Sequence, residues 1–322
     1  MKISASFAIF AAAATALPTE EHPVEAASES DAAVYARDVL TKLETLSWDK
    51  SQPPSYEVGK EWQYTCAANI LYSEQVQFWE KMWILDGYPE YPITKEAFYI
   101  PNVEAAAINT GRNKDMALES ATSTTSTKTE TKGWTIGAKA AGNFGKKDVA
   151  AGTVELSASY SDTKTTTNTE TKTVTYKGVC EPGYECRIET WSFHLKLDAT
   201  VVRAMYYQLW SLGLGLGDEK YLCLMDPVLR TCDQFTSRFD PNCPQSGASI
   251  TMFNRFKEVQ LTVPIKEGNG LQLMSRVVLV SERLSAKKAR EESEQSSIGT
   301  KETIEKAIQQ GTKFQFLDGP KE

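Results

Sequence analysis

The amino-acid sequence predicts a mainly β protein made of long twisted strands, with an N-terminal α+β aromatic-rich domain and a helical C-terminal tail. Residues 111–280 carry this expectation, because polar and apolar side chains alternate there and β-branched residues are abundant. Residues 35–110 concentrate Trp, Tyr and Phe, whereas residues 281–322 become charged and favour helix. The fold class that follows is mainly β.

Residues 1–16 are typical of a secretory signal peptide. Lys2 supplies the positive start, an apolar Ala-rich stretch follows, and Ala14-Thr15-Ala16 provides a cleavage motif. The apolar stretch is shorter than the about 20 residues that a membrane-spanning helix needs. The alternative is a buried N-terminal helix. We expect a secreted protein that is water-soluble when it is released.

Charge and cysteine content exclude several kinds of partner. The formal net charge is −7 at pH 7 and the chain has no polybasic cluster, which argues against nucleic acid. Six cysteines fit an oxidising compartment, and disulfides suit them better than zinc because no paired Cys-x-x-Cys spacing occurs. One pair is predicted, Cys180 with Cys186, since Pro182-Gly183 can turn the chain between them. No metal and no cofactor are expected.

Two segments precede the alternating region. Residues 17–34 are acidic and show no hydrophobic period, so we expect them to be disordered, as a candidate pro-segment. Residues 35–110 form the aromatic-rich domain, with a helix expected over residues 70–85. Its aromatic side chains either fill a small α+β core or form a receptor-binding surface, since Trp and Tyr dominate binding hot spots. Their exposure distinguishes the two interpretations.

Two further elements are expected near the C-terminus. Alternating residues on both sides of Gly268-Asn269-Gly270 predict a hairpin over residues 248–280. Residues 281–322 predict a charged helical tail, with Thr300 as N-cap and Gly311 as its stop. The tail is a candidate activation peptide, because charged helical tails are readily cleaved. The alternatives are a solvated tail or a docked helix.

The most informative stretch is an amphipathic hairpin expected over residues 131–161. Its two arms of about ten residues have the length that a tilted transmembrane strand needs. Pairing around Lys147 places the apolar side chains on one face and opposes Lys139 to Glu155 on the other, whereas a slip of one residue mixes the faces. The face expected to contact lipid comprises Trp134, Ile136, Ala138, Ala140, Val154, Leu156, Ala158 and Tyr160. The face expected to line a water-filled lumen comprises Thr135, Lys139, Glu155, Ser157 and Ser159.

Such a hairpin suits the wall of a transmembrane β-barrel. One hairpin alone cannot stay in lipid, because its edge amides and carbonyls would lack partners, so a homo-oligomer is required. A water-filled lumen takes about 14–18 strands, which corresponds to about seven to nine subunits at two strands each. The alternative is a surface hairpin of an ordinary β-sandwich, with its apolar face on the protein core.

The order of segments resembles the pore-forming module of the aerolysin and epsilon-toxin family. It runs from a Ser/Thr tract through GWTIGAKAAG, a charged tip, AGTVELSASYS and DTKTTTNTETKTVTYKG to the turn EPGYEC and the strand RIETWSFHLKLDATV. The resemblance covers residues 115–205. It implies an elongated soluble precursor that binds a receptor on the target-cell membrane, assembles into a ring and releases its hairpin into a barrel. The Cys180–Cys186 staple departs from the family pattern. The aromatic-rich domain shows no match, so the receptor is an unknown glycan, lipid or protein.

No residue pattern indicates catalysis. The two histidines are His22 and His194, and His194 alternates with apolar neighbours, so we expect it on the solvated face of a strand. Neither a Gly-x-Ser-x-Gly nor a His-Glu-x-x-His motif occurs. We therefore expect no enzyme. The second candidate function is a secreted, non-lytic binding module with the same β fold, either lectin-like or host-interacting, which leakage from liposomes would distinguish from a toxin.

Overall fold

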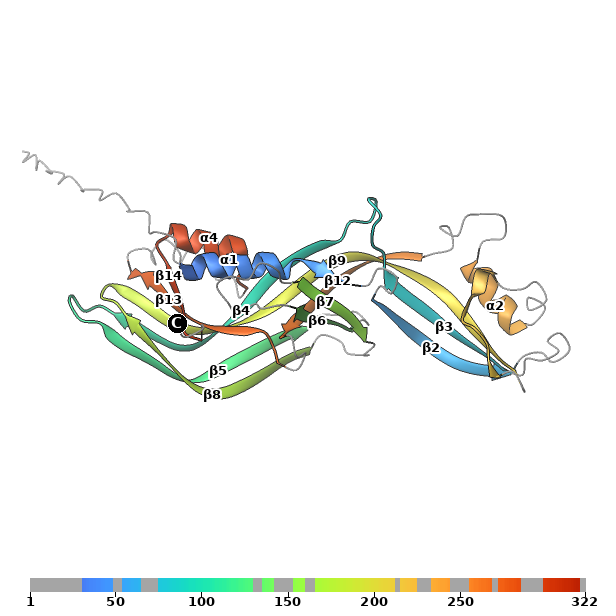
Figure 1. Ribbon diagram of the computed structural model, residues 1–322, viewed down its shortest axis with the longest axis horizontal. Coiled ribbons are helices and arrows are strands. Elements are labelled where there is room, and N and C mark those ends of the chain that lie inside the picture. Colours follow the sequence, from blue (N-terminus) through green and yellow to red (C-terminus); the bar gives the residue numbers. More distant parts are fainter. Residues whose placement is uncertain are drawn as a thin grey trace, which may run out of the picture.

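One strand, β9 (Tyr184–Ser211), runs along most of the molecule and organises the fold (Figure 1). Its 28 residues span up to about 90 Å, since a strand rises about 3.3 Å per residue. The computed structural model is accordingly elongated and mainly β, which confirms the predicted fold class. It describes residues 31–48, 54–64, 75–129, 135–141, 153–159, 166–211, 215–224, 233–243, 255–267, 272–284 and 298–318. The expected signal peptide lies outside these ranges.

Two strands in line cover the first edge of β9. β3 (Gln75–Ile84) pairs antiparallel with residues 201–210, and β4 (Thr94–Asn109) pairs with residues 184–198. β2 (Ser55–Tyr64) adds a further strand outside β3. Between β3 and β4 the chain leaves the sheet and then returns to the same edge.

The helix expected over residues 70–85 is wrong, because β3 occupies this position. Val76 and Phe78 face one side of the sheet and are fully buried, which is the period of a strand. Residues 75–84 pair with β9 on one edge and with β2 on the other. Tertiary pairing therefore overrides the local preference of the residues for helix.

The second edge of β9 is covered in the same way by β12 (Arg255–Lys266) and β13 (Ser275–Arg283). β12 pairs with residues 194–203 and β13 with residues 184–192. The hairpin expected over residues 248–280 is therefore wrong apart from its closing end, where Lys266 and Leu273 form an antiparallel bridge and the Met274 N–H donates to the Ile265 carbonyl at 2.8 Å. Both strands run in the same direction along β9, and their alternation reflects pairing with β9 rather than with each other.

Two helices lie side by side over one half of the sheet (Figure 1). They are α1 (Asp31–Leu43) and α4 (Lys301–Gln309). α1 begins inside the segment that was expected to be disordered, so residues 31–34 correct that expectation, while residues 17–30 lie outside the described ranges. The apolar face of α1 joins Ile304 of α4 in the main hydrophobic core; it consists of Ala33, Ala36, Val39, Leu40 and Leu43.

The C-terminal tail is docked and is helical only in part. Thr300 caps α4 in a capping box, and Gly311 follows it with a φ of 79°, so both predicted ends of the helix are confirmed. β13 extends past the expected boundary, and β14 (Lys313–Phe316) pairs with it. Of the open alternatives, the docked tail is the one observed.

The Ser/Thr tracts form a separate two-stranded ribbon below the main sheet (Figure 1). It consists of β5 (Met116–Thr129) and β8 (Thr166–Cys180), which pair along nearly their whole length. The Cys180–Cys186 disulfide that the sequence predicted forms at the turn from β8 into β9.

The opposite end of the molecule carries small elements around the tip of β9. A second disulfide, Cys223–Cys243, joins two of them, and its pairing was not predicted. Phe235 packs on Phe78 and Tyr207 and so covers one face of the sheet. The elements are β10 (Gly215–Leu216), β11 (Lys220–Tyr221), the 3-10 helix η1 (Leu222–Leu224) and α2 (Asp233–Asn242). None of the helices in the described ranges has the length and hydropathy needed to cross a bilayer.

Candidate functional site

The hairpin at the centre of the candidate site consists of β6 (Thr135–Ala141) and β7 (Thr153–Ser159). Its strands pair antiparallel from Thr135 opposite Ser159 to Ala141 opposite Thr153. Every pair follows the register predicted from the alternation. Trp134, Tyr160 and the tip, residues 142–152, lie outside the described ranges.

The apolar face of this hairpin points into the main core. Ala138, Ala140, Val154 and Leu156 are all buried, and Val154 is completely inaccessible to solvent. On the other face Lys139 lies opposite Glu155, which is exposed. For Thr135, Ile136, Ser157, Ala158 and Ser159 the structure defines the backbone pairing alone. In this state the apolar face is covered by protein. A soluble precursor that later inserts its hairpin requires this, and so does a surface hairpin of an ordinary β-sandwich.

Each edge of the hairpin is held by only a short stretch of backbone pairing. β1 (Leu46–Ser47) lies parallel to β7, and the Val154 N–H donates to the Thr45 carbonyl at 2.8 Å. On the other edge, two residues of β12, Ile265 and Lys266, lie parallel to β6. Two-residue pairings contribute few hydrogen bonds, each of about 0.5–1.5 kcal/mol net.

α1 and β1 together form a cover over the hairpin, which we call the N-terminal clasp (residues 31–47). The apolar side chains of α1 share one core with those of β6 and β7. Glu44 anchors the clasp, because its carboxylate accepts from the Ala97 N–H at 3.3 Å and from Lys301 Nζ at 2.7 Å. Arg37 lies 3.8 Å from Glu305 of α4. The clasp is therefore tied to β4 and α4 as well as to β7.

The β5–β8 ribbon contacts the main sheet through a polar seam centred on Glu104. This carboxylate accepts from Thr190 Oγ1 at 2.9 Å, from Thr122 Oγ1 at 3.1 Å, and from the hydroxyl and backbone N–H of Thr124. Asn102 donates to the Thr124 carbonyl at 3.0 Å. This part of the interface is therefore polar. Beside it, Leu118 of β5 packs with Ile188 of β9 and Leu279 of β13 in a small apolar cluster.

The aromatic residues of the N-terminal domain divide between core and surface. One face of the β2–β3–β9 sheet packs under α2. The opposite face carries a group of aromatic side chains, which we call the aromatic face. Trp62 and Tyr64 are 44% and 77% exposed. Cross-strand pairing places the members on one side of the sheet; they are Trp62, Tyr64, Trp79, Tyr206, Trp210 and Tyr221. The aromatic cluster is thus partly core and partly exposed surface.

The tyrosines at the inner end of the aromatic face stay uncharged. Burial raises the pKa of Tyr206, and it raises the pKa of Tyr221 to about 12. Tyr206 stacks on Trp79 with ring centroids 6.3 Å apart. The face therefore offers neutral phenol and indole groups, which suit the boundary between water and an apolar phase.

His194 does not lie on a solvated face, and that expectation is wrong. It is fully buried, stacks on Phe98 at 5.2 Å, and its Nδ1 lies 2.9 Å from the Ser192 carbonyl. The β5–β8 ribbon lies on this face of β9, where Ser123 Oγ is 3.1 Å from Thr190 Oγ1 and the Ser126 N–H donates to Ser192 Oγ at 3.1 Å, while the main core lies on the other face. Within the described ranges no cluster of His, Cys, Asp or Glu is arranged to hold a metal ion.

Comparison with known proteins gives only distant structural likenesses. No protein-family model matches the chain, and no curated protein matches it. Similar solved structures include the Cry23Aa1 and Cry37Aa1 binary complex, at 13% identity and a TM-score of 0.20, covering 66% of this chain and 85% of that one. The parasporin-2 toxin of Bacillus thuringiensis has 8% identity and a TM-score of 0.19, covering 64% and 75%. The Mpp75Aa1.1 β-pore-forming protein of Brevibacillus laterosporus has 13% identity and a TM-score of 0.16, covering 79% and 86%.

Proposed function

We propose that this protein is the secreted, soluble precursor of a β-pore-forming toxin. It binds a target-cell membrane, assembles into a homo-oligomer and inserts the β6–β7 hairpin as two strands of a transmembrane barrel. The observation that supports this proposal most strongly is the hairpin itself. One register collects its apolar side chains on a single face, and short pairings at both edges hold that face against the protein core.

In the inserted state the buried face turns from protein to lipid. The side chains proposed to contact lipid are Trp134, Ile136, Ala138, Ala140, Val154, Leu156, Ala158 and Tyr160. The lumen is proposed to be lined by Thr135, Lys139, Glu155, Ser157 and Ser159. Burying a Val or Leu side chain is worth about 1.5–3 kcal/mol in either apolar environment. Lipid therefore replaces most of the burial that the hairpin loses when it leaves the core.

Release requires three contacts to break. The clasp must leave β7, β12 must leave β6, and the apolar face must leave α1. For the β5–β8 ribbon to move with the hairpin, Glu104 and its hydroxyl partners must become hydrated, and Leu118 must leave the apolar cluster that it shares with Ile188 and Leu279. Subunit contacts then satisfy the hairpin edges, which no single hairpin can do in lipid.

The aromatic face is the proposed surface for contact with the target membrane. Trp and Tyr are favoured at the boundary of a bilayer, where one end of the side chain is apolar and the other is wet. The face lies at the end of the molecule that carries β2, β3 and α2, away from the β5–β8 ribbon (Figure 1). This separation leaves the hairpin free to move while the other end is bound.

Leakage of a trapped dye from liposomes tests this function. The full chain, with and without limited proteolysis, should release dye and form oligomers that resist SDS. Binding to liposomes or cells without leakage and without oligomers would contradict the proposal. That result would favour the second candidate, a non-lytic binding module, which the complete docking of the hairpin in the core also permits.

A further inference from the structure

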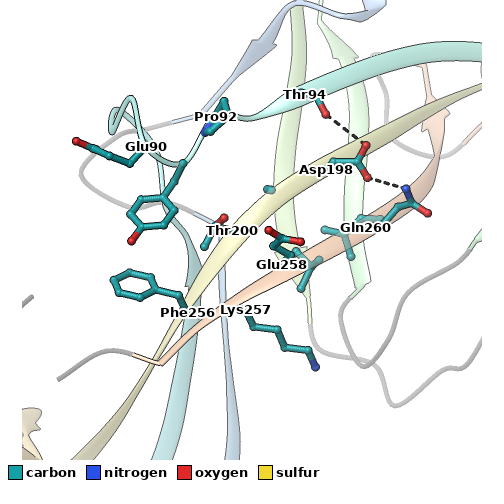
Figure 2. A pocket seen from close by; sticks show the side chains of 13 residues that line it. Glu90, Pro92, Thr94, Asp198, Thr200, Phe256, Lys257, Glu258 and Gln260 are labelled. Atoms are coloured by element: carbon teal, nitrogen blue, oxygen red, sulfur yellow. Dashed lines mark hydrogen bonds between the residues drawn. The ribbon is translucent and has the colours of Figure 1, made fainter. Parts of the chain in front are cut away.

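A groove opens where β9 loses its neighbour on one edge. Between Ile84 of β3 and Thr94 of β4 the chain arches away from the sheet, starting at Leu85, whose N–H donates to the Thr200 carbonyl at 2.9 Å. The arch, β9 and β12 enclose a groove of about 840 Å³ (Figure 2). Thr94, Asp198 and Gln260 lie in one cross-strand row at its floor. The hydrophobic core lies on the opposite face of this sheet, so a ligand can enter without disturbing it.

The carboxylate of Asp198 is held in a fixed orientation at the floor. It accepts from Gln260 Nε2 at 2.7 Å through one oxygen and from Thr94 Oγ1 at 3.3 Å through the other (Figure 2). Each oxygen keeps a further lone pair, because a carboxylate accepts up to about four hydrogen bonds. Such a planar acceptor, flanked by an amide and a hydroxyl, is suited to a ligand with neighbouring hydroxyl groups.

An aromatic wall stands beside this polar floor. Tyr91 of the arch stacks on Phe256 of β12, with ring centroids 4.9 Å apart and an angle of 16° between the rings. Phe256 is 43% exposed. Phe256 and Gln260 are four residues apart on β12, about 13 Å at about 3.3 Å per residue. The groove therefore suits an oligosaccharide, in which the aromatic surface takes the C–H face of one ring and the polar groups bind the hydroxyls of another.

The charge of the lining restricts the ligand further. Three carboxylates, Glu90, Asp198 and Glu258, line the groove with a single cation, Lys257, for a formal charge of −2. Phosphate, sulfate and carboxylate groups would be repelled by this balance. Anionic glycans and phospholipid headgroups are therefore poor ligands.

We propose that this groove binds a neutral glycan of the target surface. The inference rests on the proposed function, in that it names the class of receptor that the precursor binds before assembly. The recognition groups are Asp198, Gln260 and Thr94 for the hydroxyls, with Tyr91 and Phe256 for the sugar face.

Calorimetric titration of the full chain with oligosaccharides tests the groove without any membrane. Neutral hexose and N-acetylhexosamine oligosaccharides should bind, and sialylated or sulfated counterparts should bind at least tenfold more weakly. Asp198→Asn and Phe256→Ala should each weaken binding at least tenfold. The matched controls, Glu96→Gln and the exposed Ile108→Ala, both on β4, should leave it unchanged. Thermal unfolding of each variant shows whether it is folded, and Phe256→Ala, which changes an exposed side chain, keeps the test valid if Asp198→Asn is unstable.

The inference is overturned if no neutral oligosaccharide binds, if anionic ones bind as tightly, or if the groove variants bind like the wild type. Leakage from liposomes that lack glycolipid, at high protein concentration, measures pore formation separately. Glycan binding without leakage would contradict the toxin proposal and leave the groove in place. Leakage without glycan binding would contradict the assignment of the groove and leave the toxin proposal in place.

Discussion

The side chain of Val154 is buried in the protein core in the soluble state and is proposed to contact lipid in the inserted state. In the soluble state its side chain is fully buried, and its N–H donates to Thr45 of the clasp. In the proposed inserted state the same side chain contacts lipid. The alternation around it predicts which face is apolar, but not whether protein or lipid covers that face, because both are apolar surroundings.

Leu156 allows the cost of this burial to be measured. We expect Leu156→Ala to lower the free energy of unfolding by about 2–3 kcal/mol, because it removes a buried side chain from the main core. Glu155→Ala, one residue away on the exposed face, should change it by no more than about 0.5 kcal/mol. Urea denaturation of both variants makes the comparison. Equal effects would show that the apolar face is not packed in the core.

Glu104 makes a second prediction at the level of one residue. Glu104→Gln keeps the shape of the side chain but replaces one of the accepting oxygens with a donor, which leaves the Thr hydroxyls poorly matched. We expect the free energy of unfolding to fall by about 1–3 kcal/mol and amide hydrogen exchange to become faster at residues 122–126 of β5. Glu119→Gln, on an exposed part of the same strand, is the control. If exchange is equally fast in both variants, the seam does not depend on this carboxylate.

At the scale of elements, the β1–β7 pairing is the contact whose loss should allow release. Ser47 lies opposite Glu155 in this parallel pair, within the range that a disulfide spans. The double substitution Ser47→Cys and Glu155→Cys should block dye release when oxidised and restore it on reduction, because the clasp can then leave. The single variant Glu155→Cys should release dye under both conditions. Equal release from the oxidised and reduced double variant would show that the hairpin moves without displacing the clasp.

The docked tail supplies a further prediction about elements. Phe314 of β14 packs edge-on against Trp191, with centroids 5.8 Å apart, in the core of the main sheet. Phe314→Ala should therefore lower the free energy of unfolding by about 3–5 kcal/mol, as measured by urea denaturation. Gln315→Ala, an exposed neighbour on the same strand, is the control. An unchanged stability would mean that the tail is free to act as the activation peptide considered from the sequence.

Local signals in the sequence predicted local features well. The hairpin register, the Cys180–Cys186 disulfide and the cap at Thr300 each depend on residues close in the chain. The helix over residues 70–85 and the hairpin over residues 248–280 failed for one reason. Periodicity reveals which face of a strand is apolar, but it does not reveal which strand pairs with it. Here the partner is β9, a strand of 28 residues that lies far away in the sequence. Each edge of β9 is covered by two strands in line.

The buried position of His194 and the Cys223–Cys243 pairing were missed for a related reason. Both depend on elements that come together only in the folded sheet, and six cysteines allow 15 pairings. The groove was missed as well, because Tyr91, Asp198 and Phe256 are far apart in the sequence. No spacing rule connects them.

At the scale of the whole molecule, the three surfaces lie along one elongated body. The aromatic face lies toward one end, the groove opens beside β12, and the hairpin is docked under the clasp. This arrangement lets target binding and hairpin release occur in different places, so a loss of binding need not change the stability of the precursor.

The aromatic face provides the prediction at this scale. Trp62→Ala and Tyr64→Ala together should reduce binding to liposomes or cells by at least about tenfold, since two interfacial aromatic groups are lost. Thermal unfolding should be unchanged because both side chains are exposed. Tyr88→Ala, an exposed tyrosine outside this face, is the control. Full binding by the double variant would exclude the aromatic face as the contact surface.

The environment of adjacent hairpin residues tests the central claim most directly. Cysteines placed singly at Ile136, Lys139, Glu155 and Leu156 carry a polarity-sensitive fluorophore, read before and after assembly on liposomes that contain lipid-bound quenchers. We predict that positions 136 and 156 become apolar and quenched by lipid, while positions 139 and 155 remain in water. The same fluorescence and quenching at all four positions after assembly would contradict an inserted hairpin with one face in lipid and the other in water.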